Sequence, residues 1–209
     1  MNPVNVSYST PESVSAPNAG YEAAKRLFDA TVAWLLIMAL APVAAVVALA
    51  VLLDSPGGVF FAQERGGRYG KPFRLLKFRS MRPGTPSLST AEMRRAGVSH
   101  VTRVGVLLRR TSLDELPQLI NVLKGEMSLV GPRPALTSQT SLNAARARSG
   151  VDLLLPGITG WAQINGRDEL SDEQKVAHDV YYRHHRSFKL DLVILFRTLA
   201  SVLTGRGNR

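Results

Sequence analysis

Two adjacent carboxylates, Asp114 and Glu115, lie in a stretch of the chain that is rich in positive charge, with Arg109 and Arg110 just before them. The apolar spacing that follows predicts a helix with Asp114 as its N-cap. Unpaired N–H groups and the positive end of the helix dipole stabilise anions at such a position. These surroundings favour ionised carboxylates. An ionised aspartate can attack phosphorus when another group neutralises the charge of the phosphate.

A magnesium ion is suited to that neutralising role, because it is usually held by one or two carboxylates together with phosphate oxygens. The two acids can then divide the work, one attacking and one holding the metal. Simple helix capping explains acids in a first helical turn equally well, so catalysis and capping both stay open from the pair alone. Arg133 lies between two prolines in "VGPRP". That pattern is typical either of an ordinary turn or of a rigidly presented guanidinium for phosphate.

The composition limits the classes of protein to consider. The chain has 209 residues, a net charge of +10 and no cysteine. This length corresponds to one modest domain, and the positive charge favours an anionic partner such as nucleic acid, an anionic membrane face or phosphorylated small molecules. The lack of cysteine excludes disulfides, thiolate metal sites and cysteine nucleophiles. Residues 1–20 are rich in Pro, Ser and Asn, and we interpret them as a flexible tail.

The elements that must position the carboxylates begin with a long apolar segment. Residues 30–53 form a run of 24 residues without a charge, which is about 36 Å as a straight helix and enough to cross a membrane. Pro42 lies in its middle and predicts a kink. Basic residues flank both ends, whereas a spanning helix gathers them on the cytoplasmic side. A spanning helix and a re-entrant hairpin both remain open from this pattern.

The rest of the chain predicts a soluble part with strands and helices. Short apolar runs at 59–63 and 73–78, separated by a Gly-rich basic loop, predict two strands. Helical patterns occur at 90–97, at 116–124 with Gly125 as the stop, and within 137–150 and 171–187. The last element, 189–205, is apolar on most faces, so it can pack in the core or lie against a bilayer.

Several motifs in order resemble the bacterial sugar transferase family, the monotopic polyprenyl-phosphate phosphoglycosyl transferases. They are "KRLFD", the apolar segment with its proline, "KFRSM", "LRRTSLDELPQLINVLKGEMSLVGPRP" and "PGITGWAQINGR", and the resemblance runs from about residue 25 to 205. It implies a mainly helical α+β fold of the small type that has only the catalytic domain. The expected organisation is a tail (1–20), a membrane-inserted re-entrant helix (21–54) and a cytosolic catalytic domain with a small β element and interfacial helices (55–209).

The resemblance also implies a reaction. A UDP-sugar binds with Mg²⁺, and Asp114 attacks the phosphorus attached to the sugar and expels UMP. Polyprenyl phosphate, typically undecaprenyl phosphate, then takes the phosphosugar from the aspartyl intermediate and gives polyprenyl-diphosphate-sugar. This would be the first membrane step of a surface glycan pathway. Glu115 matches the acid that the family associates with Mg²⁺.

Other positions are carried over from the motifs of the family. Arg109 matches a basic residue assigned to phosphate recognition, and Arg133 matches a contact to the nucleotide sugar. Lys77 and Arg79 of "KFRSM" are weaker candidates for binding a phosphate or a lipid head group, since a solvated basic strand would look the same. Asp29 of "KRLFD" is expected to be structural, at the base of the membrane hairpin.

The resemblance favours the re-entrant topology over the spanning one. The family's hairpin is broken at a proline that usually follows a serine, whereas this chain has Ala41 before Pro42. We therefore expect a monotopic protein on the cytosolic face of the bacterial inner membrane, in contact with phospholipid. A site at the membrane surface would reach both a lipid phosphate and a soluble sugar nucleotide.

Three other functions are weighed against this one. A basic nucleic-acid-binding membrane protein would explain the charge but not the acid pair or the apolar hairpin, so no nucleic-acid partner is expected. A non-catalytic scaffold would have no need for the acids and arginines at the motif positions. A nucleotide-sugar hydrolase would use water as the final acceptor. The sequence does not select the sugar, the pathway or the oligomeric state.

Overall fold

The computed structural model describes residues 19–85, 100–166 and 169–204. The predicted α+β, mainly helical fold is confirmed: helices make up most of the described chain, and the strands form two small sheets. The tail at 1–18 and the helix predicted at 90–97 lie outside the described residues.

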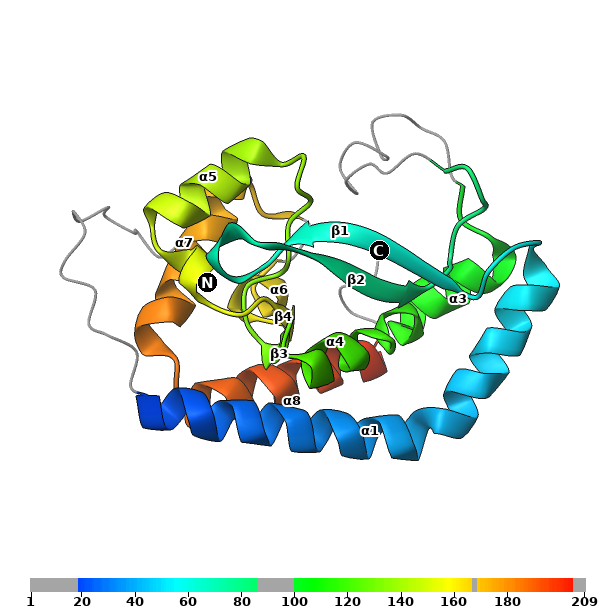
Figure 1. Ribbon diagram of the computed structural model, residues 1–209, viewed down its shortest axis with the longest axis horizontal. Coiled ribbons are helices and arrows are strands. Elements are labelled where there is room, and N and C mark those ends of the chain that lie inside the picture. Colours follow the sequence, from blue (N-terminus) through cyan, green and yellow to red (C-terminus); the bar gives the residue numbers. More distant parts are fainter. Residues whose placement is uncertain (1–18, 86–99, 167–168, 205–209) are drawn as a thin grey trace.

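The apolar segment forms one helix, α1 (Ala19–Asp54), with Pro42 inside it. It is long and apolar enough to cross a membrane. Figure 1 shows that α1 changes direction partway along its length, so the expected break is a bend within a continuous helix. The bend has a physical reason, because a proline removes a helical hydrogen bond and its ring clashes with the preceding turn. Ala33 before the bend and Val47 after it are both buried, so both halves contact the folded body.

The two predicted strands are confirmed as an antiparallel hairpin. β1 (Phe60–Gly66) pairs with β2 (Pro72–Phe78) from Phe60 opposite Phe78 to Gly66 opposite Pro72. β1 therefore runs three residues further than the apolar run 59–63 indicated. The tip is a short 3₁₀ turn, η1 (Arg68–Gly70).

Three helical pieces follow the hairpin and carry the acid pair. They are α3 (Arg103–Thr111), the 3₁₀ turn η2 (Leu113–Glu115) and α4 (Gln118–Lys124). The predicted stop at Gly125 is confirmed, since this residue caps α4 with a φ of 81°, which glycine adopts readily. Helix α3 was not predicted.

A second sheet consists of two short parallel strands that sequence patterns did not predict, β3 (Ser128–Val130) and β4 (Gly157–Thr159). Its backbones approach so closely that a Cβ at Gly157 would lie 2.1 Å from the Gly131 nitrogen. The remaining helices are α5 (Thr140–Arg148), η3 (Val151–Leu153), α6 (Trp161–Ile164), α7 (Asp172–His185) and α8 (Phe188–Thr204). Those at α5 and α7 were predicted and are confirmed.

The main core joins the first half of α1 to β2, α4, β3, α7 and α8. A second cluster joins the other half of α1 to β2 and α3. Large apolar side chains remain exposed on the helices, among them Trp34, Leu35 and Met38 of α1, Val106 and Leu107 of α3, Ile120 and Leu123 of α4, and Phe196 and Leu199 of α8. These exposed side chains, together with α1, indicate membrane association.

Candidate active site

The structure brings two predicted cations, Lys77 and Arg133, to the carboxylate of the predicted acid Glu115. Glu115 comes from η2, Lys77 from β2, and Arg133 from the loop after β3. The Lys77 Nζ lies 2.8 Å and the Arg133 Nη2 lies 3.0 Å from the same oxygen, Glu115 Oε1. Segments more than 50 residues apart in sequence thus converge on the predicted acid pair. We call Lys77, Asp114, Glu115 and Arg133 the carboxylate cluster.

Asp114 is the buried member of this cluster, with 6% of its surface exposed. Its Oδ2 lies 4.0 Å from the Lys77 Nζ. Burial raises the pKa of Asp114, the positive charge of Lys77 opposes that rise, and the negative charge of Glu115 adds to it. The expectation that the surroundings simply favour ionisation is therefore wrong for Asp114, because loss of hydration outweighs the nearby cations.

The predicted N-cap position of Asp114 is also wrong. Ser112 ends α3 in the left-handed region, with a φ of 57°. The chain then makes the 3₁₀ turn η2, which contains Asp114, and Pro117 is the N-cap of α4. Asp114 thus lies in a tight turn between two helices. This placement buries its carboxyl against the hairpin instead of exposing it at a helix start.

The two remaining predicted site residues, Arg109 and Arg79, donate hydrogen bonds to other groups. The Arg109 Nε donates to the Ser80 Oγ at 3.0 Å, and the charge of Arg109 lowers the pKa of Asp114, so this arginine contributes to the potential at the cluster. The Arg79 guanidinium instead donates to the carbonyls of Ser55 and Pro56, just past the end of α1. Cations near the C-terminal end of a helix satisfy its last carbonyls. Arg79 is thus bonded to the two residues that follow α1 and not to the acids.

Arg65 of β1 is a neighbour of the cluster that sequence reasoning treated only as flanking charge. It donates to the Pro134 carbonyl and to the Gln63 side chain, and lines a small cavity with Lys77, Gln118 and Arg133. Burial, with the like charge of Arg133, lowers the pKa of Arg65 to about 10. Its Nε is buried without a hydrogen-bond partner in the described part of the chain. The sequence signal for Arg65 was its spacing of two residues from Gln63, which places both side chains on the same face of a strand.

A buried ion pair fixes the backbone that carries Arg133. The Arg146 Nη1 donates to the Arg133 carbonyl at 2.8 Å, while its Nε and Nη2 donate to Asp179 Oδ2 at 3.0 and 2.7 Å. Asp179 is almost fully buried in α7. The Arg146–Asp179 pair and the two prolines beside Arg133 restrict the backbone of this loop. The Arg133 side chain therefore extends from a backbone of fixed conformation.

The donor set bears on the expected metal. No group of three or more His, Cys, Asp or Glu side chains with metal-binding spacing occurs among residues 19–85, 100–166 and 169–204. The cluster offers two hard carboxylates, and one oxygen of Glu115 already accepts from two cations. Such a set fits Mg²⁺, which protein sites commonly hold through one or two carboxylates plus substrate phosphates. It does not resemble an all-protein metal cage.

Fold and site together define a membrane-associated protein with a buried aspartate set among cations next to its apolar helix. Comparison with known proteins is specific: the family model described as bacterial sugar transferase matches residues 20–205. The chain belongs to the bacterial sugar transferase family.

Curated relatives cover most of the chain. The uncharacterized sugar transferase EpsL of Bacillus subtilis (strain 168) is 45% identical over 186 residues, which is 88% of this chain and 89% of EpsL. The UDP-glucose:undecaprenyl-phosphate glucose-1-phosphate transferase of Caulobacter vibrioides is 41% identical over 195 residues, covering 90% of this chain and 73% of that protein. An undecaprenyl-phosphate N-acetylgalactosaminephosphotransferase of Aeromonas hydrophila is 37% identical over 209 residues, covering 92% of this chain and 47% of that protein.

Proposed function

We propose that the protein transfers a phosphosugar from a UDP-sugar to a polyprenyl phosphate, with undecaprenyl phosphate as the expected acceptor. The observation that carries this proposal is the carboxylate cluster, in which buried Asp114 lies beside Lys77 while Glu115 is held by two cations. The names of the relatives support the substrate classes, since the Caulobacter protein is named for UDP-glucose and undecaprenyl phosphate.

The chemistry takes two displacements at one phosphorus. A carboxylate oxygen of Asp114 attacks the phosphorus bonded to the sugar, and the bond from that phosphorus to the bridging oxygen breaks, so UMP leaves. The product is an aspartyl-phosphosugar. A phosphate oxygen of the polyprenyl phosphate then attacks the same phosphorus, which releases the diphosphate-linked sugar and regenerates the Asp114 carboxylate. A covalent two-step path of this kind gives ping-pong kinetics.

The positive charges of Lys77 and Arg133 reduce the repulsion between the Asp114 carboxylate and the diphosphate of the donor. Their positive charges lower the pKa of Asp114 and favour its ionised, nucleophilic form. Both also fix the Glu115 carboxylate. Asp114 and Glu115 would hold Mg²⁺ together with the diphosphate of the donor, and the bound metal would supply charge neutralisation on the leaving UMP. Arg109 is proposed to bind phosphate. For Arg79 its bonds to the end of α1 favour a structural role.

The proposed membrane arrangement is based on the shape and packing of α1. We propose that α1 enters and leaves one face of the membrane, so that the catalytic part lies entirely on the cytosolic side. A straight helix of this length would extend about 54 Å. The bend and the packing of both halves against the body support a helix that stays with the catalytic part rather than crossing alone. The acids then lie close to the lipid phosphate of the acceptor.

The identity of the sugar does not follow from family membership. The Caulobacter relative is named for glucose and the Aeromonas relative for N-acetylgalactosamine, at similar identity to this chain. A screen of UMP release across UDP-sugars, with purified enzyme, Mg²⁺ and undecaprenyl phosphate, selects the donor.

Omitting the acceptor tests the proposed reaction. With donor and Mg²⁺ alone, UMP release should stop near one equivalent per enzyme, because the phosphosugar stays on Asp114. Continued turnover without acceptor would instead indicate a hydrolase, and no release with any UDP-sugar would favour a non-catalytic scaffold. The Asp114→Asn variant is the matched control and should release none.

A further inference from the structure

The small cavity beside the carboxylate cluster has a lining suited to an anion. It is lined by Arg65, Leu75, Lys77, Gln118, Arg133 and Pro134. Three of these side chains are cations and none is an acid. Its volume is about 10 Å³, which corresponds to a single oxygen-sized atom. The cavity is therefore too small for a whole phosphate but can hold one of its oxygens.

Gln118 is a buried amide without a partner at this cavity. It is the first residue of α4 and is 2% exposed, and its side chain makes no hydrogen bond within the described part of the chain. Asn121 on the same helix is also buried, but its amide bonds to the Leu76 nitrogen, the Arg74 carbonyl and the Glu126 carboxylate. Buried polar groups are normally hydrogen-bonded, so the free amide of Gln118 needs an explanation.

The Gln118 amide can still be reached from outside the protein. Among the described residues, the fully enclosed side-chain nitrogen and oxygen atoms without a partner belong to Asp29, Arg65, Arg79 and Gln163. Gln118 is not one of them, so its unpartnered amide atoms keep some accessible surface. Because Gln118 lines the cavity, this is the space from which a ligand atom would reach the amide.

Lys77 connects the cavity to the proposed nucleophile. Its Nζ donates to Glu115 Oε1 at 2.8 Å and lies 4.0 Å from Asp114 Oδ2. An ammonium has three N–H groups, so one bond to Glu115 leaves Lys77 with donors for another acceptor. A phosphoryl oxygen that accepts from Lys77 in this cavity would therefore lie next to the Asp114 carboxylate.

Arg65 and Arg133 add positive charge to the same cavity. Burial and then the like charge of Arg133 lower the pKa of Arg65 to about 10, and the charge of Glu115 opposes this shift. The Arg65 guanidinium is held in place, since Nη1 donates to the Pro134 carbonyl at 3.2 Å and Nη2 to Gln63 Oε1 at 2.5 Å. An anionic oxygen between the two guanidinium groups would offset their repulsion.

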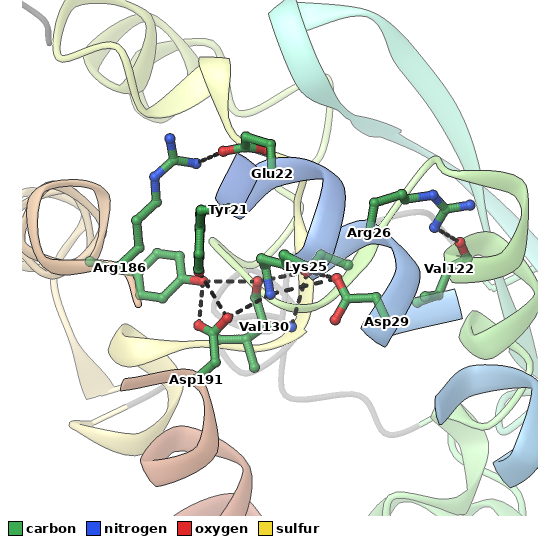
Figure 2. Close-up of polar contacts among 11 residues, drawn as sticks. Tyr21, Glu22, Lys25, Arg26, Asp29, Val122, Val130, Arg186 and Asp191 are labelled. Atoms are coloured by element: carbon green, nitrogen blue, oxygen red, sulfur yellow. Dashed lines mark hydrogen bonds and ion pairs between the residues drawn. The ribbon is translucent and has the colours of Figure 1, made fainter. Parts of the chain in front are cut away.

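The larger cavity at the base of α1 has a different character. Its volume is about 470 Å³, and most of its charged side chains are paired with other protein groups. Figure 2 shows these ion pairs, of Lys25 with Asp29 and Asp191 and of Arg186 with Glu22. These contacts join the first turns of α1 to α7 and α8, which indicates a structural network.

We propose that the small cavity receives one non-bridging oxygen of the phosphoryl group that Asp114 attacks, with N–H groups of Gln118 and Lys77 donating to it. Gln118 is then a further catalytic residue. This inference rests on the proposed function and adds a residue to its site. The oxygen carries negative charge during the displacement, and donors that are fixed beforehand stabilise that charge without having to reorganise.

The first test is single-turnover UMP release by the Gln118→Met variant, which keeps the side-chain volume and removes the amide. Its rate should fall about tenfold or more, with little change in KM for the UDP-sugar. Gln174→Met, which removes an exposed glutamine amide from the first turn of α7, is the matched control and should keep the wild-type rate. A wild-type rate in Gln118→Met would refute this inference alone. No UMP release by the wild type would refute the proposed function, and this inference with it.

Thermal unfolding of the substrate-free protein separates catalysis from a structural role. Gln118→Met replaces an unpartnered buried amide with an apolar group, so its thermal midpoint should equal or exceed that of the wild type. A midpoint several degrees lower would show that the fold itself needs the amide, and would contradict the proposal.

A donor with sulfur in place of a non-bridging oxygen on the attacked phosphorus tests the contact itself. It exists as two diastereomers, and one of them directs the larger sulfur, a poor hydrogen-bond acceptor, into the cavity. The wild type should react about tenfold more slowly with that diastereomer than with the other. Gln118→Ala enlarges the cavity and removes the donor, so the difference should shrink. Equal rates for the two diastereomers in the wild type, or an unchanged ratio in Gln118→Ala, would overturn the proposal.

Discussion

At the scale of single residues, Asp114 combines two opposing demands. A nucleophile toward phosphorus must be ionised, yet burial raises the pKa of this carboxyl, and Glu115 adds to that rise. Lys77 is the strongest of the groups that counter it. Perturbed pKa values of this kind are common at catalytic sites, where desolvation makes a charged group reactive and nearby charges keep it ionised.

Lys77 should therefore set the lower pH limit of the reaction. Replacing Lys77 with Met removes the main charge that lowers the pKa of Asp114, so less of the aspartate is ionised at a given pH. The acidic limb of single-turnover UMP release should move to higher pH, with Lys71→Met, an exposed lysine of the hairpin, as control. A limb that stays in place in Lys77→Met would show that Lys77 does not tune the nucleophile.

The same shift predicts a change in stability. A raised pKa in the folded state means that the folded protein holds the proton more tightly, so this contribution to stability is present at low pH and is lost as the pH rises through the folded pKa. The Asp114→Asn variant has no carboxyl to ionise, so it does not lose this stability as the pH rises. Its thermal midpoint at pH 7.5 should be a few degrees higher than that of the wild type, which corresponds to about 1 kcal/mol. At pH 4 the gain should shrink. A gain that is larger at pH 4 than at pH 7.5 would contradict this account.

At the scale of elements, regular segments were predictable and their junctions were not. The hairpin, α5, α7 and the Gly125 stop were marked by periodicity and turn residues. The junction at η2 was not, because the left-handed turn at Ser112, which leads from α3 directly into η2, has no periodic pattern and no glycine to mark it. The short parallel pair β3–β4 was missed for a similar reason, since three-residue strands carry no periodic signal and depend on distant partners.

The site was predictable in its residues more than in its geometry. Motifs identified Asp114, Glu115, Lys77 and Arg133, and the structure brings them together. The contacts of Arg65 and Arg79 depend on long-range placement of the hairpin against Pro134 and the end of α1. Such contacts do not follow from local sequence. Burial of Asp114 likewise results from tertiary packing, which is why its pKa direction was wrongly expected.

The Arg146–Asp179 pair should act on substrate binding through the loop of Arg133. Arg146→Lys keeps the charge but cannot make all three bonds, so the Arg133 carbonyl loses its anchor. We expect KM for the UDP-sugar to rise about tenfold with a smaller change in kcat, because the variant loses the charge-assisted hydrogen bond from residue 146 to the Arg133 carbonyl. Steady-state kinetics test this, with Arg148→Lys, exposed on the same helix, as control. An unchanged KM would leave the pair a purely structural role.

At the scale of the whole molecule, the bent α1 and the exposed apolar helices fit a protein that rests on one membrane face. The net charge of +10 adds attraction to anionic lipids. Both substrates of the proposed reaction can meet at such a surface, because one is soluble and the other has its phosphate at the interface. Both halves of α1 pack against the rest of the described chain.

Topology is directly testable because the chain has no cysteine. Single variants Ala24→Cys and Gly58→Cys place a thiol at exposed positions before and after the apolar run. In inside-out membrane vesicles, a membrane-impermeant maleimide should label both, since both ends lie on the cytosolic side. Labelling of only one of the two in sealed vesicles would show a spanning helix and contradict the monotopic proposal.

The most direct test of the central claim is to identify the covalent intermediate. The enzyme is incubated with Mg²⁺ and a UDP-sugar that carries a labelled phosphate next to the sugar, without acceptor, then quenched, digested and analysed by mass spectrometry. The account predicts one phosphosugar per chain on the peptide containing Asp114, which undecaprenyl phosphate removes on addition. Stoichiometric label on another residue, or transfer to the lipid with no labelled peptide at any time point, would contradict it.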